Sequence, residues 1–501
     1  MATSARTRSS RTSGSSATGQ RDDRCSGASR RTAAAVGAVL DFAAMRTAIR
    51  NTTIVTCDAG RTVHHDATLV VEDDRIAAID LTNRMADQPG TDVIDGRGEA
   101  VFPGLSNCHT HLHLTHSRGI QEDFDFPSTL RFPSTVAAFM THEELGVFAA
   151  LGAVEAIRSG TTALIEIGFD VPAYAKAIVA SGLRLVLAQS CSDVVADAVA
   201  TSAMFSPARG DASLQRVADF VERWHGAEGG RITCCVAAHA PEACSPELLR
   251  AARTLAESRR LRYTIHLNQS RWEVEQIMLR RGVRPTEYLA RIDFLGPDLI
   301  AAHCRFMAPS EVALLGRSRA FVSHNAAMAA RRAAAPPIQA LAAAGCTIAM
   351  GSDNMAEDMV EVMRTGLFME RVARQDAQSP QPEDVLEWAA GNGARALGHG
   401  EIAGSLEVGK KADFFVVDVR RPNLVPAVRI VSGFVHNGQA GDIEAVMVDG
   451  RWLMRERKVL TLDEQDIVAR AETIGQRVWR QLVEKYPDVP FRIRLPGRPP
   501  A

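Results

Sequence analysis

From residue 101 to about residue 400, short apolar runs alternate with stretches of helical period, such as 145–158, 246–258 and 272–280. Eight apolar runs have the length of strands: 100–102, 161–167, 184–189, 232–239, 263–267, 299–303, 321–324 and 347–351. Strands that alternate with helices indicate a parallel sheet, and eight repeats predict an α/β chain with a closed (β/α)8 TIM barrel. A doubly wound open sheet is the alternative, but no Gly-rich phosphate turn follows an early strand.

Shorter strands are predicted on both sides of this region, where apolar and polar positions alternate. They cover residues 53–56, 67–71 and 75–79 before it and residues 413–418, 445–449 and 451–454 after it. We therefore expect residues 101–403 to form the barrel, and residues 45–100 and 404–460 to form a small β-sandwich domain from both chain ends. An amphipathic period over 467–485 predicts that residues 461–501 are a closing helix and a tail.

Residues 1–44 differ from the rest in being rich in Ser, Thr, Ala and Arg, with no steady apolar period. Such a segment buries too little apolar surface to offset its ordering entropy, so we expect a disordered extension. It is similar to a transit peptide in being Arg-rich and acid-poor. The composition favours a misassigned start over a transit peptide, and Met45 would then open the chain.

The composition, 46% hydrophobic and 23% charged, is that of a globular protein, and no apolar run has the roughly 18 residues that span a bilayer. A net charge of −2 gives no basic field for nucleic acid. The nine cysteines contain no C-x-x-C pair, which predicts reduced and mostly buried thiols in a cytoplasmic protein. These features favour a small-molecule substrate over nucleic acid or a membrane.

Polar residues gather at the carboxyl ends of the predicted barrel strands, where barrel enzymes place their catalytic groups. They are His109, His111, His266, His303, His324 and Asp353. Residues i and i+2 of a strand face the same side, so His109 and His111 can reach one ion. A lone histidine is usually a satisfied core residue, but several at the strand ends of one barrel indicate a metal site. Imidazole and carboxylate ligands without thiolate suit zinc, and also iron(II), manganese or cobalt.

Several segments together resemble the motifs of the amidohydrolase superfamily. They are VFPGLSNCHTH (101–111), HAPEACSPELL (239–249), IHL (265–267), AHC (302–304), GSDN (351–354) and GSLEVGKKAD (404–413). The resemblance covers about residues 46–460. It points to the branch that contains atrazine chlorohydrolase, cytosine and guanine deaminases, S-adenosylhomocysteine deaminases and molinate hydrolase, which hydrolyses a thiocarbamate. Members of this branch are often dimers, which implies a homo-oligomer.

The resemblance also implies roles for single residues. The metal ligands would be His109, His111, His266 and Asp353. The catalytic groups would be His303, Asp353 and Gln269, and the substrate-binding groups His239, His324 and Asn325. Members with two metals bridge them by a carboxylated lysine on strand 4, but this chain has no lysine between Lys176 and Lys410. One divalent ion, zinc first, is therefore expected.

Gln269 departs from the family pattern, because the deaminases have a glutamate three residues after the strand-5 histidine. Glutamine cannot titrate, and loss of a positioned acid or base costs about 10²–10⁴-fold in rate. Either Asp353 and His303 carry all the protons, or Glu273 substitutes, or the substrate differs. We therefore expect poor deamination of adenosine, guanine and cytosine.

The function that fits these features is hydrolysis of a non-peptide C–N bond in an amide, urea, carbamate, thiocarbamate or aminated heterocycle. Three alternatives stay open. The first is a hydrolytic dehalogenase or thiocarbamate hydrolase that releases halide or thiol. The second is a heterocycle deaminase, and the third is an inactive metal-binding scaffold.

Overall fold

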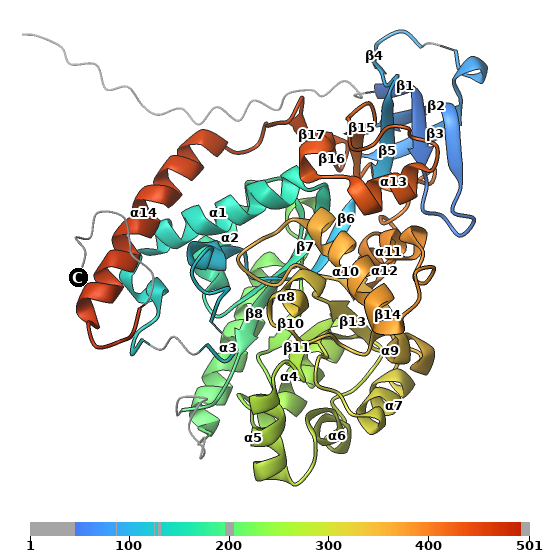
Figure 1. Ribbon diagram of the computed structural model, residues 1–501. Coiled ribbons are helices and arrows are strands. Elements are labelled where there is room, and N and C mark those ends of the chain that lie inside the picture. The colour runs from blue at the N-terminus through green and yellow to red at the C-terminus, as the bar shows by residue number, and fades with distance from the viewer. Residues whose placement is uncertain (1–45, 87, 125, 129–131, 196–204, 492–501) are drawn as a thin grey trace, which may run out of the picture. The chain divides into compact units, whose positions relative to one another are not determined.

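The computed structural model describes residues 46–86, 88–124, 126–128, 132–195 and 205–491. Its central sheet is parallel and runs in the order β6-β7-β8-β10-β11-β12-β13-β14, with β9 beside β8 (Figure 1). The strands are β6 (Leu105–Thr110), β7 (Thr161–Gly168), β8 (Arg184–Cys191), β9 (Ile232–Cys234), β10 (Val236–Ala238), β11 (Tyr263–Leu267), β12 (Leu299–His303), β13 (Phe321–His324) and β14 (Thr347–Met350).

The two ends of this sheet meet just after β14. The Asp353 N–H donates to the His109 carbonyl at 2.9 Å, and the Asp353 carbonyl accepts from the His111 N–H at 2.8 Å. These bonds join the segment after β14 to β6, so the predicted (β/α)8 barrel is confirmed.

Two of the predicted strand bounds are wrong. The run 100–102 is not the first barrel strand: it belongs to β5 (Glu99–Pro103), which pairs with strands near both chain ends, and β6 opens the barrel. The chain passes from one sheet to the other at Gly104, where a Cβ would lie 1.9 Å from the Thr162 hydroxyl oxygen. The run 232–239 is divided at Cys235 into β9 and β10.

Helices connect and cover the strands. They are α1 (His142–Arg158), α2 (Val171–Val179), α3 (Pro207–Trp224), α4 (Pro246–Arg259), α5 (Arg271–Arg281), α6 (Pro285–Arg291), α7 (Pro309–Arg317), α8 (Ala326–Arg331), α9 (Ile338–Ala344), α10 (Met359–Arg374), α11 (Pro382–Ala389), α12 (Gly391–Ala396), α13 (Ile430–Asn437) and α14 (Glu464–Lys485). Ser206, Ser245 and Ser270 begin α3, α4 and α5 by accepting a backbone N–H of the first turn. The three predicted helices correspond to α1, α4 and α5.

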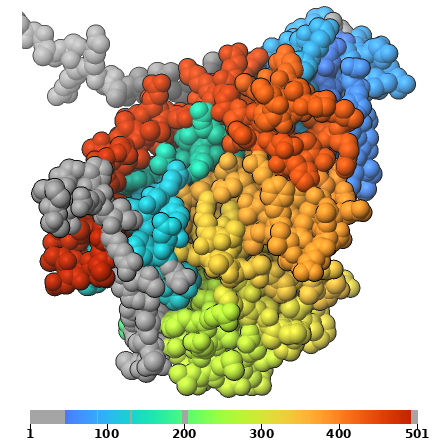
Figure 2. Space-filling view, in the orientation of Figure 1, coloured from blue at the N-terminus to red at the C-terminus, as the bar shows by residue number. Residues whose placement is uncertain are grey.

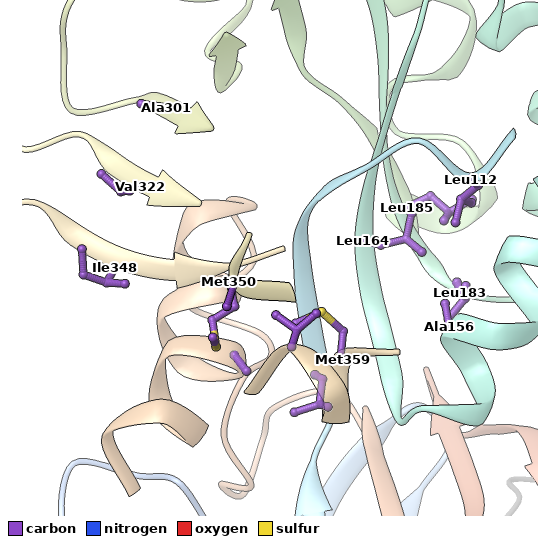
Figure 3. Packing of buried hydrophobic residues seen from close by; sticks show 14 of the residues in the cluster. Leu112, Ala156, Leu164, Leu183, Leu185, Ala301, Val322, Ile348, Met350 and Met359 are labelled. Atoms are coloured by element: carbon purple, nitrogen blue, oxygen red, sulfur yellow. The ribbon is translucent and has the colours of Figure 1, made fainter. Parts of the chain in front are cut away.

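Two interleaved sets of side chains explain why the barrel strands are almost wholly apolar. Leu164, Leu185, Val322 and Ile348 belong to a large cluster that also contains helix residues such as Ala156 (Figure 3). Their strand neighbours, among them Ile165 and Val186, belong to a second cluster built almost entirely from strand residues. Successive strand residues face opposite sides, so the first set packs against the helices and the second fills the barrel.

A second sheet combines strands from both ends of the sequence. Its order is β18-β17-β16-β15-β5-β1-β2-β3, with β4 beside β1. The strands are β1 (Arg46–Val55), β2 (Val63–Glu72), β3 (Arg75–Leu81), β4 (Thr91–Asp95), β5, β15 (Phe414–Asp418), β16 (Ile443–Val448), β17 (Arg451–Arg455) and β18 (Lys458–Val459). Figure 2 shows the early segment in blue beside the late one in orange.

This terminal sheet is one hydrogen-bonded path rather than two separate sheets. Ile49, Leu69, Val101, Phe414 and Met447, from five of its strands, share one apolar cluster. One face of this sheet therefore carries an apolar core of its own.

The predicted C-terminal helix is α14, which packs against α1 and η3 (Val136–Phe139). Trp479 lies in that contact and donates its indole N–H to the His116 carbonyl at 2.7 Å. In the described part of the chain, no helix is both long and apolar enough to cross a bilayer. All described cysteines except Cys57 are buried, and none forms a disulfide. The expectations for residues 1–44 and 492–501 lie outside the described residues.

Candidate active site

The strand-end residues predicted from the sequence converge at the carboxyl end of the barrel. Ligand atoms of His109, His111 and His266 lie within 4.8 Å of one another, and so do those of His109, His303 and Asp353. All five side chains are buried. Because β6, β11, β12 and the segment after β14 end at the same rim, residues far apart in the sequence form one cluster.

Two of the histidines are held in a defined tautomer by backbone carbonyls. His111 Nδ1 lies 2.7 Å from the Ile167 carbonyl oxygen, and His266 Nδ1 lies 2.6 Å from the His239 carbonyl oxygen. A carbonyl can only accept, so each Nδ1 carries the proton and each Nε2 keeps its lone pair. These two Nε2 atoms are 3.3 Å apart, an arrangement that a shared cation stabilises.

Asp353 lies beside three imidazoles of the cluster. Its Oδ1 lies 3.8 Å from His109 Nε2 and 3.7 Å from His111 Nε2, and its Oδ2 lies 3.8 Å from His303 Nδ1. The Asp353 backbone has a φ of 76°, an uncommon conformation for a residue with a side chain. The hydrogen bonds to β6 hold this conformation, which is typical of strain kept at functional sites.

His303 is oriented by Asn325, whose side-chain amide lies 3.1 Å from His303 Nδ1. Asn325 Oδ1 accepts from the Ser323 hydroxyl at 2.8 Å, which turns the amide nitrogen toward His303. His303 Nδ1 therefore accepts, and the proton is on Nε2. A Cβ at Gly351 would lie 2.6 Å from Asn325 Oδ1 and 2.9 Å from His109 Cβ, so this packing requires glycine.

Burial favours the neutral form of three histidines in the cluster, His109, His266 and His303. Burial, with a smaller contribution from neighbouring histidines, lowers the pKa of His109 and His266 well below its usual range, and burial followed by the Arg305 charge does the same for His303. Burial also raises the pKa of Asp353. Both ring nitrogens of His109 are buried without a hydrogen-bond partner in the described part of the chain. Neutral imidazoles, one carboxylate and an unpaired buried nitrogen fit a divalent cation.

A cavity of about 300 Å³ opens above this cluster. Its walls include the apolar side chains Leu114, Phe126, Phe169 and Met328. The polar groups facing it include His111, His239, His266, Gln269, His303, Arg305, Arg332 and Asp353. No lysine is among the described residues that line the cavity.

The three residues expected to bind substrate are placed differently. His239 lines the cavity, with its ring 4.9 Å from the ring centres of Phe169 and His266. Burial lowers the pKa of His239 to about 4. His324 is fully buried, and neither it nor Asn325 is among the lining residues. The observed contact of Asn325 is with His303.

Glu273 is not among the described residues that line the cavity. It is fully buried, and its Oε1 and Oε2 accept the backbone N–H groups of Asn268 and Gln269 at 2.8 and 2.6 Å. Glu273 therefore supports the loop that carries Gln269. The Gln269 amide itself lines the cavity and has no hydrogen-bond partner among the described residues.

Glu166 is a supporting residue that the sequence analysis missed. It lies fully buried in β7 and accepts from the Thr110 hydroxyl at 2.9 Å, the Leu112 N–H at 2.8 Å and the Tyr174 hydroxyl at 2.7 Å. These bonds fix the segment that carries the His109 and His111 pair. A carboxylate inside an apolar strand was the available signal.

Asn107 was also missed. Its Oδ1 accepts the Ser352 N–H at 2.9 Å, and its amide donates to the Ser352 hydroxyl at 2.7 Å. It thereby ties β6 to the residue before Asp353. Arg305 was missed as well, although it stands two residues after His303 at a strand end.

Comparisons with known proteins agree with this architecture. The model of the amidohydrolase family matches residues 100–453. A 5'-deoxyadenosine deaminase of Methanosarcina acetivorans is 31% identical over 439 residues, which cover 86% of this chain and 98% of that protein. A 5-methylthioadenosine/S-adenosylhomocysteine deaminase of Desulforudis audaxviator is 32% identical over 444 residues, which cover 87% and 99%.

Solved structures share the fold. An adenosine deaminase from Xanthomonas campestris with bound zinc superposes with a TM-score of 0.79 at 24% identity, over 87% of this chain and 99% of that one. Atrazine chlorohydrolase from Arthrobacter aurescens, complexed with zinc, gives a TM-score of 0.75 at 20% identity, over 86% and 100%. The family match spans most of the barrel and the return into the terminal sheet, so this chain belongs to the amidohydrolase family.

Proposed function

We propose that this chain is a zinc-dependent hydrolase that cleaves a non-peptide C–N bond of a small molecule with water. The observation that carries the proposal is the pair of His111 and His266 Nε2 atoms, which face each other at 3.3 Å while both Nδ1 atoms donate to carbonyls. Two lone pairs so close are stable when a cation lies beside them. The amidohydrolase match gives the reaction class.

One ion would be held by His109, His111, His266 and Asp353. His303 is left out because its Nδ1, the nitrogen nearest Asp353, already accepts from Asn325. Its protonated Nε2 is then available to donate to the substrate. Zinc is the first choice because it suits nitrogen and carboxylate ligands, and it would supply an activated water molecule.

The chemistry follows from this arrangement. When bound, a divalent ion lowers the pKa of a water molecule toward about 7. The Asp353 carboxylate would accept a proton from the attacking water molecule as the new C–O bond forms. His303 holds the attacked group by its Nε2–H. The C–N bond then breaks, and Asp353 returns the proton to the leaving nitrogen, so atoms and charge balance.

Gln269 decides which leaving groups suit the site. Its amide can donate and accept hydrogen bonds but cannot deliver a proton, and Glu273 is engaged by backbone N–H groups. Amides, ureas and carbamates, in which the carbonyl is already electrophilic, need less help from a titrating group at this position. We place them ahead of the aminated heterocycles.

Deamination of an adenosine-type nucleoside is the second candidate. It is favoured by the two relatives described above, which are both deaminases of adenosine derivatives and match nearly end to end. Release of halide or thiol is a third outcome, and a silent metal-binding barrel a fourth. A homo-oligomer also stays a prediction, which light scattering of the purified protein would test.

A metal assay and a substrate panel separate these candidates. We expect about one zinc ion per chain by elemental analysis of the purified protein. Ammonia or amine should appear from ureas, amides or carbamates faster than from adenosine derivatives. Chloride or thiol release from matched substrates would indicate the third candidate, and bound metal without turnover the fourth. Two ions per chain would contradict the proposed ligand set.

A further inference from the structure

A buried cation in the cavity wall is unused by the proposed reaction. Arg305 is 8% exposed and lines the cavity. Its Nε is buried without a partner, and among the described residues its guanidinium makes no hydrogen bond and no ion pair. Burial lowers the pKa of Arg305, which reflects the cost of desolvating the charge. A buried charge without a partner lowers the stability of the fold unless a bound ligand supplies an opposite charge or hydrogen-bond acceptors.

The position of Arg305 is built into the fold. His303 and Cys304, which precede it, have φ values of 76° and 54°, so the chain turns sharply where β12 ends. The Cys304 N–H then donates to the Leu267 carbonyl at 2.9 Å, and the Phe306 N–H donates to the Asn268 carbonyl at 3.0 Å. Backbone bonds on both sides hold Arg305 against the end of β11, so its side chain starts from a fixed point beside the cluster.

The charges around the cavity favour an anion. Asp353 is the one carboxylate among the lining residues, and the proposed function assigns it to the metal. Arg305 and Arg332 both line the cavity, and Arg332 donates to the backbone carbonyls of Gln121 and Phe124. With a divalent ion in place, Asp353 would be engaged by the metal, and Arg305 would be a positive charge without a carboxylate partner among the described lining residues. Gln269 lines the same cavity and is uncharged.

We propose that Arg305 binds a carboxylate of the substrate, so that this enzyme acts on small C–N compounds that carry a carboxylate group. The planar guanidinium fork matches a carboxylate with two parallel N–H···O bonds, which a lysine cannot reproduce. The pairing would satisfy the buried Nε and would fix the distance between the anionic end of the substrate and His303. The inference rests on the proposed function and names the substrate class for the same site.

The test measures carboxylate binding and does not depend on turnover. Calorimetry on the metal-loaded protein compares benzoate with benzamide and butyrate with butyramide. Each pair has the same shape and differs in charge. The proteins are wild type, Arg305→Met, Arg305→Lys and Arg331→Met. Arg331 is a matched control because it lies at the end of α8, pairs with Glu361 at 3.1 Å and is not among the lining residues.

We expect at least one carboxylate to bind wild type more tightly than its amide. Arg305→Met should weaken that carboxylate by about 10- to 100-fold, the range for hydrogen bonds to charged groups, and should leave amide binding unchanged. Arg305→Lys should retain part of the affinity, and Arg331→Met should retain nearly all of it. Elemental analysis and circular dichroism of each variant check that the ion and the fold are kept.

Two results would overturn the inference. One is that no carboxylate binds wild type better than its amide. The other is that Arg305→Met and Arg331→Met weaken carboxylate binding equally, since a long-range charge effect would then suffice. If Arg305→Met does not fold, Arg305→Lys supplies the same comparison. The proposed function fails separately, by the absence of bound metal or of C–N hydrolysis across the substrate panel.

Discussion

The two ends of the barrel bury arginine in opposite ways. Arg184 begins β8 at the amino end of the barrel and is 1% exposed. Its Nε donates to Asp413 Oδ2 at 2.7 Å, and its Nη2 donates to Asp449 Oδ1 at 2.6 Å. Arg305 follows β12 at the carboxyl end and makes no such bond among the described residues. The same residue type is satisfied by the protein at one end and unsatisfied at the other.

The difference separates stability from function. At the amino end, Asp413 and Asp449 come from the terminal sheet, so the Arg184 pairs fasten that sheet to the barrel. At the carboxyl end, both ring nitrogens of His109 and the Nε of Arg305 are buried without a partner among the described residues, and Arg305 lines the cavity. Buried polar groups are nearly always satisfied in folded proteins, so an unpaired polar atom on a residue that lines a cavity indicates a place where a ligand can bind.

The largest expected effect is on catalysis at the carboxyl end. His109→Ala should remove the metal and lower the rate by about 10³-fold or more, because activation of water is worth several kcal/mol. The free energy of unfolding of the metal-free protein should change little by comparison. Elemental analysis, initial rates and urea unfolding measure the three quantities. His142→Ala, on an exposed residue at the start of α1, is the control. Full activity in His109→Ala would contradict the ligand set.

At the amino end the largest effect should be on stability. Arg184→Met leaves the buried Asp413 carboxylate without its cation, whereas Asp449 keeps Lys411 at 3.2 Å, and should cost about 3–5 kcal/mol in the free energy of unfolding. Arg305→Met removes an unpaired charge and should leave the ligand-free protein equally stable or more stable. Urea unfolding of both variants gives the comparison. If Arg184→Met and Arg305→Met lower the free energy of unfolding equally, the protein satisfies the two arginines to the same extent, and the comparison is wrong.

A smaller effect concerns pH and His399, which lies near Arg184 at the amino end. Burial, followed by the Arg184 charge, lowers the pKa of His399 to about 3. The unfolded imidazole titrates near 6.5, so below that pH the unfolded chain binds a proton that the folded chain refuses. Stability from this group is therefore present above pH 6.5 and is lost as the pH falls toward 3.

The expected loss from His399 between pH 7 and pH 5 is about 2 kcal/mol, and it should be absent in His399→Gln. Urea unfolding at pH 7 and pH 5 measures the slope of the free energy of unfolding against pH. An unchanged slope in His399→Gln would show that the histidine titrates normally in the folded protein.

The smallest effect is predicted for Gln269→Glu. A carboxylate there adds negative charge beside the reacting water and should lower the rate of native C–N hydrolysis by about tenfold. It should also introduce weak deamination of adenosine, guanine or cytosine. Gln215→Glu, on the exposed face of α3, controls for net charge. Rapid deamination of these substrates by wild type would contradict this prediction and would indicate an ordinary nucleobase or nucleoside deaminase.

The sequence was sufficient to predict the barrel and the histidine cluster, because both follow from local pattern. Alternating strands and helices impose a parallel sheet, and parallel strands bring their carboxyl ends to one rim. His266, His303 and Asp353 could therefore be grouped although they are far apart in the chain. The terminal sheet was predictable for the same reason, from alternating strands at both ends.

Only the tertiary structure decided the roles of groups whose partners are distant in sequence. The backbone N–H groups that occupy Glu273, the amide of Asn325 that fixes the His303 tautomer, and the missing partner of Arg305 are all matters of position in space. Hydrogen bonding and burial depend on which elements pack together, and no periodicity records that. The sequence alone therefore determined that the reactive groups lie at the carboxyl end of the barrel. Packing decided which residues face the cavity there and which charge has no partner in the protein.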